Sequence, residues 1–393
     1  MSFQPLEGIR VVDLTSSLAG PTCTEILGAL GADVVKIEHP GRGDEARDWG
    51  PRFFEGGSAM FFAANASKRS LALDVRDPRG KEVLLRLVDR ADVFVQSLRA
   101  GTAERLALGW EALFTRNERL VYCSIRAFGR RGPLAGAPGY DPLMQAFAGI
   151  VSITGEPGRP GVRVGASLVD IGTGVWAALG IVAALHERTQ TGRGREVDVA
   201  LFETALSLVG YQLTDVLRSG VAPGRFGTGF SLIAPYEVFA TADGELMIAA
   251  GNDRLFTRLC VGIGRPELAA DPRFRTNPDR VANRAELVPL LRDELAKQSS
   301  AHWLEALADI PVAPVQDLAQ VAAHEQTQAT GMLQDLGGIE TVAAPLQVDG
   351  ERVAHRSPAP LLGAHTADVL AELGYSAGEI AELAAASVTR LVR

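Results

Sequence analysis

Residues 9–38, IRVVDLTSSLAGPTCTEILGALGADVVKIE, contain two short apolar runs separated by a turn of small residues and a helical pattern. The runs Ile9–Leu14 and Asp33–Glu38 are rich in β-branched residues, which favours buried strands. Thr22–Leu30 lies between them and is followed by Gly31, a common end signal for a helix. A strand, a helix and a strand in so short a stretch predict a βαβ unit with parallel strands.

The same alternation continues as far as about residue 200. The further strand candidates are Lys68–Val75, Ala91–Gln96, Leu120–Ile125 and Glu196–Val199. This pattern predicts an α/β fold with a Rossmann-like parallel sheet. No G-x-G-x-x-G follows the first strand, where the chain reads Ser17-Leu18-Ala19-Gly20-Pro21, so a redox nucleotide is not favoured.

Composition indicates a two-domain chain. Glycine, proline and aromatic residues become frequent after Gly220, which places a large domain over 1–220 and a small α+β domain over 221–330, followed by 331–393. In the small domain, Asp243-Gly244 predicts a hairpin turn, and Asn283 and Ser300 are candidate helix caps. The segment Gly227–Gly229 can be a flap over a site or a linker.

Charge and cysteine content restrict the class of protein. The 393 residues carry a net charge of −8, which argues against a general nucleic-acid binder, although the more basic stretch 36–131 could hold a small polyanion. Cys23, Cys123 and Cys260 are far apart and give neither a disulfide framework nor metal-ligand spacing. No apolar run reaches membrane length and the N-terminus lacks a signal pattern, so we expect a cytoplasmic protein that neither enters a membrane nor binds a metal.

The stretch Val164–Gly174, VGASLVDIGTG, places Asp170 before a helix that is apolar all round, Val175–His186. One interpretation is that Asp170 caps this helix. The other is that Asp170 is a nucleophile or base, since helix N-termini stabilise anions and Gly172 and Gly174 allow a substrate to approach the backbone. Local sequence is compatible with both.

Cationic residues recur where the predicted strands end. His39, Arg76, Arg99 and Arg126 follow four of them. Because the carboxyl ends of parallel strands meet at one edge of a sheet, these side chains could bind phosphate or carboxylate there. Charge alone is equally compatible with a solvated surface.

Nearly the whole chain resembles the family III coenzyme A transferases, also called the CaiB/BaiF family. The matching stretches are Leu6–Pro21, Leu30–Arg47, Lys68–Lys81, Gly139–Gly155, Thr191–Thr204, Pro235–Gly244 and Pro360–Leu370. The resemblance implies that residues 331–393 return to the large domain and that two chains form an interlocked homodimer.

The resemblance also implies chemistry. Asp170 matches the family nucleophile, which exchanges CoA between an acyl-CoA and a free carboxylic acid through a mixed anhydride and an aspartyl-CoA thioester. CoA would enter as a substrate, with no tightly bound cofactor. The family pattern assigns CoA contacts to Ser17, Leu18, Ala19, His39, Leu73, Arg76, Ser97, Leu98, Arg105 and Tyr140. Of these, Arg76 and Arg105 would face phosphates.

Two departures bear on the substrate. Formyl-CoA:oxalate transferases carry glutamine where Leu18 stands and a longer glycine run where this chain has Gly227-Thr228-Gly229, which favours another dicarboxylic acid as acceptor. The acceptor pocket would include loops around Trp49, Phe53 and residues 227–231. An α-methylacyl-CoA racemase is an alternative, but Tyr140 replaces its histidine and is a poor base near neutral pH. An inactive CoA-binding protein is the third interpretation.

Overall fold

The computed structural model describes residues 3–51 and 55–392, which divide into two compact units. The first unit takes in residues 1–150, 164–218 and 326–393, and the second takes in 151–163 and 219–325. Residues 151–163, which the sequence analysis left in the large domain, therefore group with the second unit. Phe53 lies outside the described residues.

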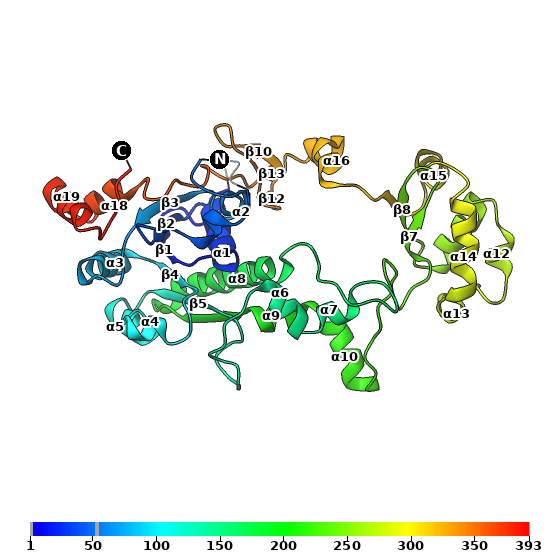
Figure 1. Cartoon of the computed structure of the whole chain (residues 1–393), viewed down its shortest axis with the longest axis horizontal. Helices are drawn as coiled ribbons and strands as arrows, with labels where there is room; N and C mark the ends of the chain where they lie inside the picture. Colours follow the sequence, from blue (N-terminus) through cyan, green and yellow to red (C-terminus); the bar gives the residue numbers. More distant parts are fainter. Residues whose placement is uncertain (1–2, 52–54, 393) are drawn as a thin grey trace. The chain divides into compact units, whose positions relative to one another are not determined.

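A six-stranded parallel sheet forms the centre of the first unit, in the order β3-β2-β1-β4-β5-β6 (Figure 1). Its strands are β1 (Arg10–Leu14), β2 (Asp33–Glu38), β3 (Lys68–Ala72), β4 (Val93–Gln96), β5 (Val121–Arg126) and β6 (Glu196–Ala200). Val12 pairs with Val35 on one side and with Phe94 on the other. All three are buried, as expected where helices cover both faces of a parallel sheet. The predicted α/β fold with a Rossmann-like sheet is confirmed.

Helices pack on this sheet through one apolar side. The helices that position the site are α1 (Ala19–Ala29), α3 (Pro78–Arg90), α4 (Thr102–Arg105), α6 (Asp141–Phe147), α8 (Leu168–Thr191) and α9 (Leu201–Leu208). In α3, Val83, Leu84 and Val88 are buried while charged residues face outward. Asp77 accepts a hydrogen bond from the backbone N–H of Arg79 and caps this helix just before Pro78.

The C-terminal residues return to the first unit. Helices α18 (Thr366–Glu372) and α19 (Ala377–Ala385), red in Figure 1, add Val369, Leu370 and Leu383 to the core cluster of the sheet. Backbone bonds fasten this segment, because the N–H of Asp74 donates to the carbonyl of Val388 at 2.8 Å.

Helix α8 differs from the prediction in two ways. It already begins at Leu168, so the segment from Gly172 to Gly174 is helical and not a flexible entrance. It is also not buried all round, since Ile171, Val175 and Leu179 are 45–55% exposed. The apolar residues on the exposed side of α8 are therefore not covered by any of the residues in 3–51 and 55–392.

Close packing explains Gly174. A Cβ there would lie 2.8 Å from the carbonyl oxygen of Ala19 and 2.8 Å from the Cβ of Thr22, closer than real Cβ atoms come. Since α1 and α8 pack against each other, the absence of a side chain at Gly174 lets the start of α1 approach α8 closely. The sequence analysis had assigned this glycine to substrate approach, and its observed contacts are with α1.

The second unit is a small α+β body. Its sheet joins β7 (Tyr236–Ala240), β8 (Glu245–Ala249) and β9 (Val312–Pro314) in antiparallel order. Its helices are α11 (Asp253–Gly262), α12 (Glu267–Ala270), α13 (Asn277–Ala282), α14 (Arg284–Leu295) and α15 (Ser300–Ala306).

Both predicted caps in this unit were wrong in detail. The side chain of Asn283 donates to the carbonyls of Arg273 and Asp279 and makes no cap bond to α14. Ser299, not Ser300, caps α15 by accepting from the N–H of His302.

Among the described residues, α8 is the one helix long and apolar enough to cross a membrane, with a mean hydropathy of 1.9 over its most apolar window. It packs against α1, α9, β5 and β6. The core helix of a globular domain passes the same test of length and composition.

Candidate active site

Asp170 lies in the first turn of α8 and does not cap it. The cap comes from α6, where the buried carboxylate of Asp141 accepts the backbone N–H groups of Val169 at 2.8 Å and of Asp170 at 3.3 Å. The amide of Gln145 donates to the other Asp141 oxygen at 2.6 Å and fixes its orientation. The carboxylate of Asp170 has no hydrogen-bond partner in the described part of the chain. The capping interpretation of Asp170 is therefore wrong.

The surroundings of Asp170 favour its protonated form. Burial raises the pKa of Asp170 to about 7, and the negative charge of Asp141 adds to the increase. A carboxylate with such a pKa is more basic than an ordinary aspartate and is still substantially ionised near neutral pH. This combination is typical of functional carboxyl groups.

The amides at the start of α8 are already occupied. The N–H of Leu168 donates to the carbonyl of Ala166, and that of Ile171 donates to the carbonyl of Ser167. Together with the two bonds to Asp141, these leave none of the first-turn amides for an oxyanion. A helix N-terminus commonly stabilises an anion, and here the carboxylate of Asp141 already occupies that position.

The loop after β1 is held in an unusual conformation. Ser17 has φ of 71°, in the left-handed region that non-glycine residues rarely adopt. Its backbone N–H donates to Asp44 at 3.1 Å, and its hydroxyl donates to the carboxylate of Glu45. The hydroxyl of Tyr140 also donates to Glu45, at 3.3 Å. Glu45 thus joins Ser17 to the residue that precedes Asp141.

A buried pair of opposite charges supports this loop. The ammonium group of Lys36 lies 2.8 Å from the carboxylate of Asp44 and donates to the carbonyl of Thr15 at 3.0 Å. Burial alone would lower the pKa of Lys36, but Asp44 and Asp13 outweigh burial and raise it. The charged ammonium therefore holds the ends of β1 and β2 at a fixed spacing.

A second pair lies beside the first. Nε and Nη2 of Arg47 each donate to one carboxylate oxygen of Glu38 at 2.7 Å, in the bidentate geometry that suits these groups. The hydroxyl of Ser70 donates to the same carboxylate at 2.7 Å. Glu38 and Asp44 are therefore neutralised within the protein.

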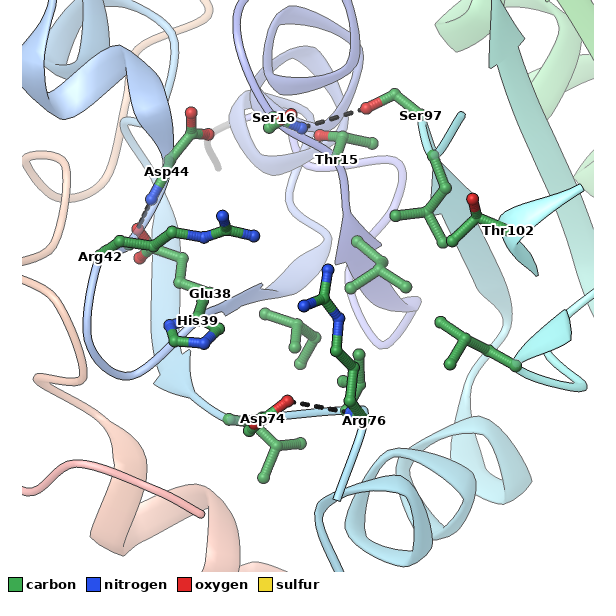
Figure 2. A pocket seen from close by; sticks show the side chains of 17 residues that line it. Thr15, Ser16, Glu38, His39, Arg42, Asp44, Asp74, Arg76, Ser97 and Thr102 are labelled. Atoms are coloured by element: carbon green, nitrogen blue, oxygen red, sulfur yellow. Dashed lines mark hydrogen bonds between the residues drawn. The ribbon is translucent and has the colours of Figure 1, made fainter. Parts of the chain in front are cut away.

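A cavity of about 190 Å³ opens at the carboxyl edge of the sheet (Figure 2). The residues that line it are Leu14, Thr15, Ser16, Ile37, Glu38, His39, Arg42, Gly43, Asp44, Leu73, Asp74, Val75, Arg76, Ser97, Leu98, Thr102 and Leu106. The strand order reverses between β1 and β4, and the N–H of Ser16 donates to the hydroxyl of Ser97 across this point. Ligands of open α/β sheets bind at such switch points.

The structure brings five of the predicted CoA residues into this cavity, namely His39, Leu73, Arg76, Ser97 and Leu98. Ser17, Leu18, Ala19, Arg105 and Tyr140 do not line it. Arg105 instead donates to the hydroxyl of Thr102 at 2.7 Å and is exposed.

Sequence reasoning missed Arg42, whose guanidinium group points into the cavity beside Arg76 (Figure 2). Its position in the Gly41-Arg42-Gly43 turn directly after β2 was the available signal, because side chains at that edge meet the ligand.

Comparison with known proteins shows which family the chain belongs to. Residues 6–366 match the profile of CoA-transferase family III. The chain is 41% identical to an acetyl-CoA:oxalate CoA-transferase of Acetobacter aceti, over 90% of this chain and 92% of that protein. It is 37% identical to a succinyl-CoA:glutarate CoA-transferase of Mus musculus, over 98% and 91% of the two chains.

A solved structure of a CaiB/BaiF family protein from Brucella suis is also similar, with a TM-score of 0.86 and 38% identity over 95% of this chain and all of that one. Both the sequence match and the structural match extend across nearly the whole chain. The protein belongs to CoA-transferase family III.

Proposed function

We propose that this CoA-transferase moves CoA from an acyl-CoA to a dicarboxylic acid through covalent intermediates on Asp170. The observation that carries the proposal is that two neighbouring aspartates differ in their hydrogen bonding. Asp141 is buried and caps α8, while Asp170, in the first turn of that helix, has a raised pKa and a carboxylate with no hydrogen-bond partner among the described residues. A carboxylate with no structural partner is available to attack a substrate.

The proposed reaction has four displacements. The Asp170 carboxylate attacks the thioester carbonyl, the C–S bond breaks, and a mixed anhydride and CoA thiolate result. The thiolate then attacks the aspartyl carbonyl, which releases the donor acid and leaves an aspartyl-CoA thioester. The acceptor carboxylate displaces the thiolate to form a second anhydride, and the thiolate attacks its acyl carbon to give the new acyl-CoA and free Asp170.

The environment of Asp170 matches what these steps require. A carboxylate partly removed from water is a stronger nucleophile, and a pKa of about 7 leaves a large ionised fraction at neutral pH. The tetrahedral oxyanions need N–H donors, and the first-turn amides of α8 are already paired. We therefore assign that role to backbone amides outside the first turn of this helix.

The cavity at the sheet edge would hold the nucleotide end of CoA. Its wall contains Leu73 and Leu98, which suit the faces of an adenine ring, and its rim carries His39, Arg76 and Ser97. We keep Ser17, Leu18, Ala19, Arg105 and Tyr140 as proposed contacts along the rest of the CoA molecule. Ala19 packs against α8 one turn after Asp170, so the loop after β1 leads from the cavity toward the nucleophile.

The acceptor is proposed to be a dicarboxylic acid. The names of the relatives contain oxalate and glutarate, which are dicarboxylates of different length. Leu18 and the short glycine segment disfavour oxalate by family pattern, whereas a relative with 41% identity is named for it. A panel of acceptors from oxalate to glutarate, with one acyl-CoA donor, would rank them by kcat/KM.

Racemisation and simple CoA binding predict different outcomes. A racemase needs a second base, and at the relevant place Tyr140 donates its hydroxyl to Glu45. Exchange of the thioester α-proton in heavy water would support a racemase. Binding of CoA with neither exchange nor transfer would support an inactive binder.

We also propose a homodimer, interlocked as in the family. Large apolar side chains of the first unit are exposed on α6, α8, α9 and α10 (Gly210–Ser219); they are Leu143, Phe147, Ile171, Val175, Trp176, Leu179, Leu208, Tyr211, Leu213 and Leu217. So many exposed large apolar side chains on neighbouring segments favour an association site. Light scattering at micromolar concentration should give twice the mass of one chain, and a folded monomer would refute the proposal.

Substitution of Asp170 tests the covalent mechanism. Asp170→Asn, Asp170→Ser and Asp170→Ala should each abolish transfer, since none can form an anhydride. The matched control is Glu203→Gln, which removes a carboxylate from the first turn of the neighbouring helix α9 and should keep activity. Retained turnover in Asp170→Asn would refute the assignment.

A further inference from the structure

Two arginines in the cavity have no side-chain partner among the residues that the structure describes. Neither Arg42 nor Arg76 forms a side-chain hydrogen bond or ion pair within the described ranges. Both guanidinium groups point toward the centre of the cavity, Arg42 from the loop after β2 and Arg76 from the loop after β3 (Figure 2). Unpaired guanidinium groups that converge on one space form a site for an anion.

The other charges around the cavity leave this space electropositive. Glu38 is neutralised by Arg47 and Asp44 by Lys36. Asp74 accepts the backbone N–H of Arg76 and is the remaining acidic group in the lining.

His39 adds a donor to the same site. The N–H of Gly41 donates to Nδ1 of His39 at 3.1 Å, so the neutral ring carries its proton on Nε2. Two guanidinium groups and one imidazole N–H can together surround several oxygens of a single phosphate.

The position of the cavity selects which phosphate of CoA would lie there. Arg42 and Arg76 follow β2 and β3, whereas α8, which carries Asp170, packs against β5 and β6 at the opposite end of the sheet. The thiol of CoA must reach Asp170, so the groups farthest from the thiol, adenine and the 3′-phosphate, belong at β2 and β3. A phosphomonoester carries close to two negative charges at neutral pH, which matches two arginines.

We infer that Arg42 and Arg76 form a clamp for the 3′-phosphate of CoA and so select CoA over dephospho-CoA. This inference rests on the proposed use of the cavity for the nucleotide end of CoA. It adds Arg42 as a specificity-determining residue, and Arg105, which donates to Thr102, is not part of the clamp.

Calorimetric titration of the full chain with CoA and with dephospho-CoA tests the clamp. Wild type should bind CoA about 10-fold to 100-fold more tightly, since charge-assisted hydrogen bonds have that value. Arg42→Ala and Arg42→Gln should each reduce this preference by about 10-fold and leave dephospho-CoA binding unchanged. Arg79→Ala is the matched control, because Arg79 is exposed nearby and pairs with Asp77; it should keep the full preference.

If Arg42→Ala weakened the binding of CoA and dephospho-CoA equally, Arg42 would lie at the diphosphate and the inference would be overturned. Unchanged binding of both ligands in Arg42→Ala would also overturn it. Transfer assays keep the two proposals separable. Turnover through Asp170 without 3′-phosphate selection by Arg42 would refute only the clamp. A 3′-phosphate preference that depends on Arg42, with no transfer by any acyl-CoA, would refute only the proposed reaction.

Discussion

Replacing Asp170 with asparagine should stabilise the folded chain above pH 7 while it abolishes turnover. The carboxyl group has a pKa of 3.8 when exposed and about 7 in the folded chain, because burial and Asp141 disfavour its charge. Between these two values the folded chain holds a proton that the unfolded chain has lost. Stability is therefore lost as pH rises from about 4 to about 7, and the full loss is present above that window.

The size of the effect follows from the same two values. A rise from 3.8 to about 7 corresponds to at most about 4 kcal/mol at 1.36 kcal/mol per pH unit. Asp170 is partly accessible to water, and the asparagine amide has its own desolvation cost, so we expect a gain of about 1–3 kcal/mol at pH 8. At pH 4 the gain should vanish.

Urea unfolding of wild type and Asp170→Asn at pH 4, 6 and 8 measures this difference. Asp215→Asn is the matched control, since Asp215 is exposed on α10 and its substitution should change stability little at any of the three pH values. A variant that is no more stable than wild type at pH 8 would contradict the reasoning. Unchanged stability is expected if Asp170 were a structural cap, because asparagine caps a helix about as well as aspartate.

Three further sets of substitutions probe the surroundings of the site. Asp141→Ala should destabilise the chain by about 1–2 kcal/mol, since two N–H groups of α8 lose their acceptor. Asp141→Asn keeps an acceptor, so it should lose less stability and should lower the pKa on the acid limb of the kcat profile. An unchanged pKa on that limb would show that Asp141 does not act on Asp170. Gly174→Val should cost at least about 1–3 kcal/mol by overpacking against Ala19, and a thermal melt unchanged from wild type would refute that contact. Arg47→Met should cost about 3–5 kcal/mol by leaving Glu38 buried and unpaired, whereas the double variant with Glu38→Gln should recover part of that loss in urea unfolding.

The sheet was predictable because its signal is local. Each buried strand is a short β-branched run, and the helices between them carry one apolar face, so the order of elements followed from pattern alone. The extent of α8 was not predictable in this way, because Gly172 and Gly174 normally weaken a helix. Packing against α1 requires the small residue at Gly174, and that contact joins residues far apart in the sequence.

The residues of the candidate site also differ in whether local sequence could predict their roles. Asp170 and Arg76 were found from their positions after apolar runs, with family resemblance to support them. That Asp141 would cap α8 depends on a bond across 28 residues, for which the local sequence gives no signal. The same holds for Arg42, because its charge alone could not show that Lys36 and Arg47 would neutralise the neighbouring carboxylates and leave it unpaired.

The central claim is that Asp170 becomes covalently attached to substrate. Wild type incubated with acyl-CoA in the absence of an acceptor acid, then digested and analysed by mass spectrometry, measures this directly. We predict that CoA mass will be added to the peptide that contains Asp170, and that hydroxylamine will convert the same residue to its hydroxamate. An adduct on Asp141 or Glu203, or no adduct on any carboxylate while transfer proceeds, would contradict the claim.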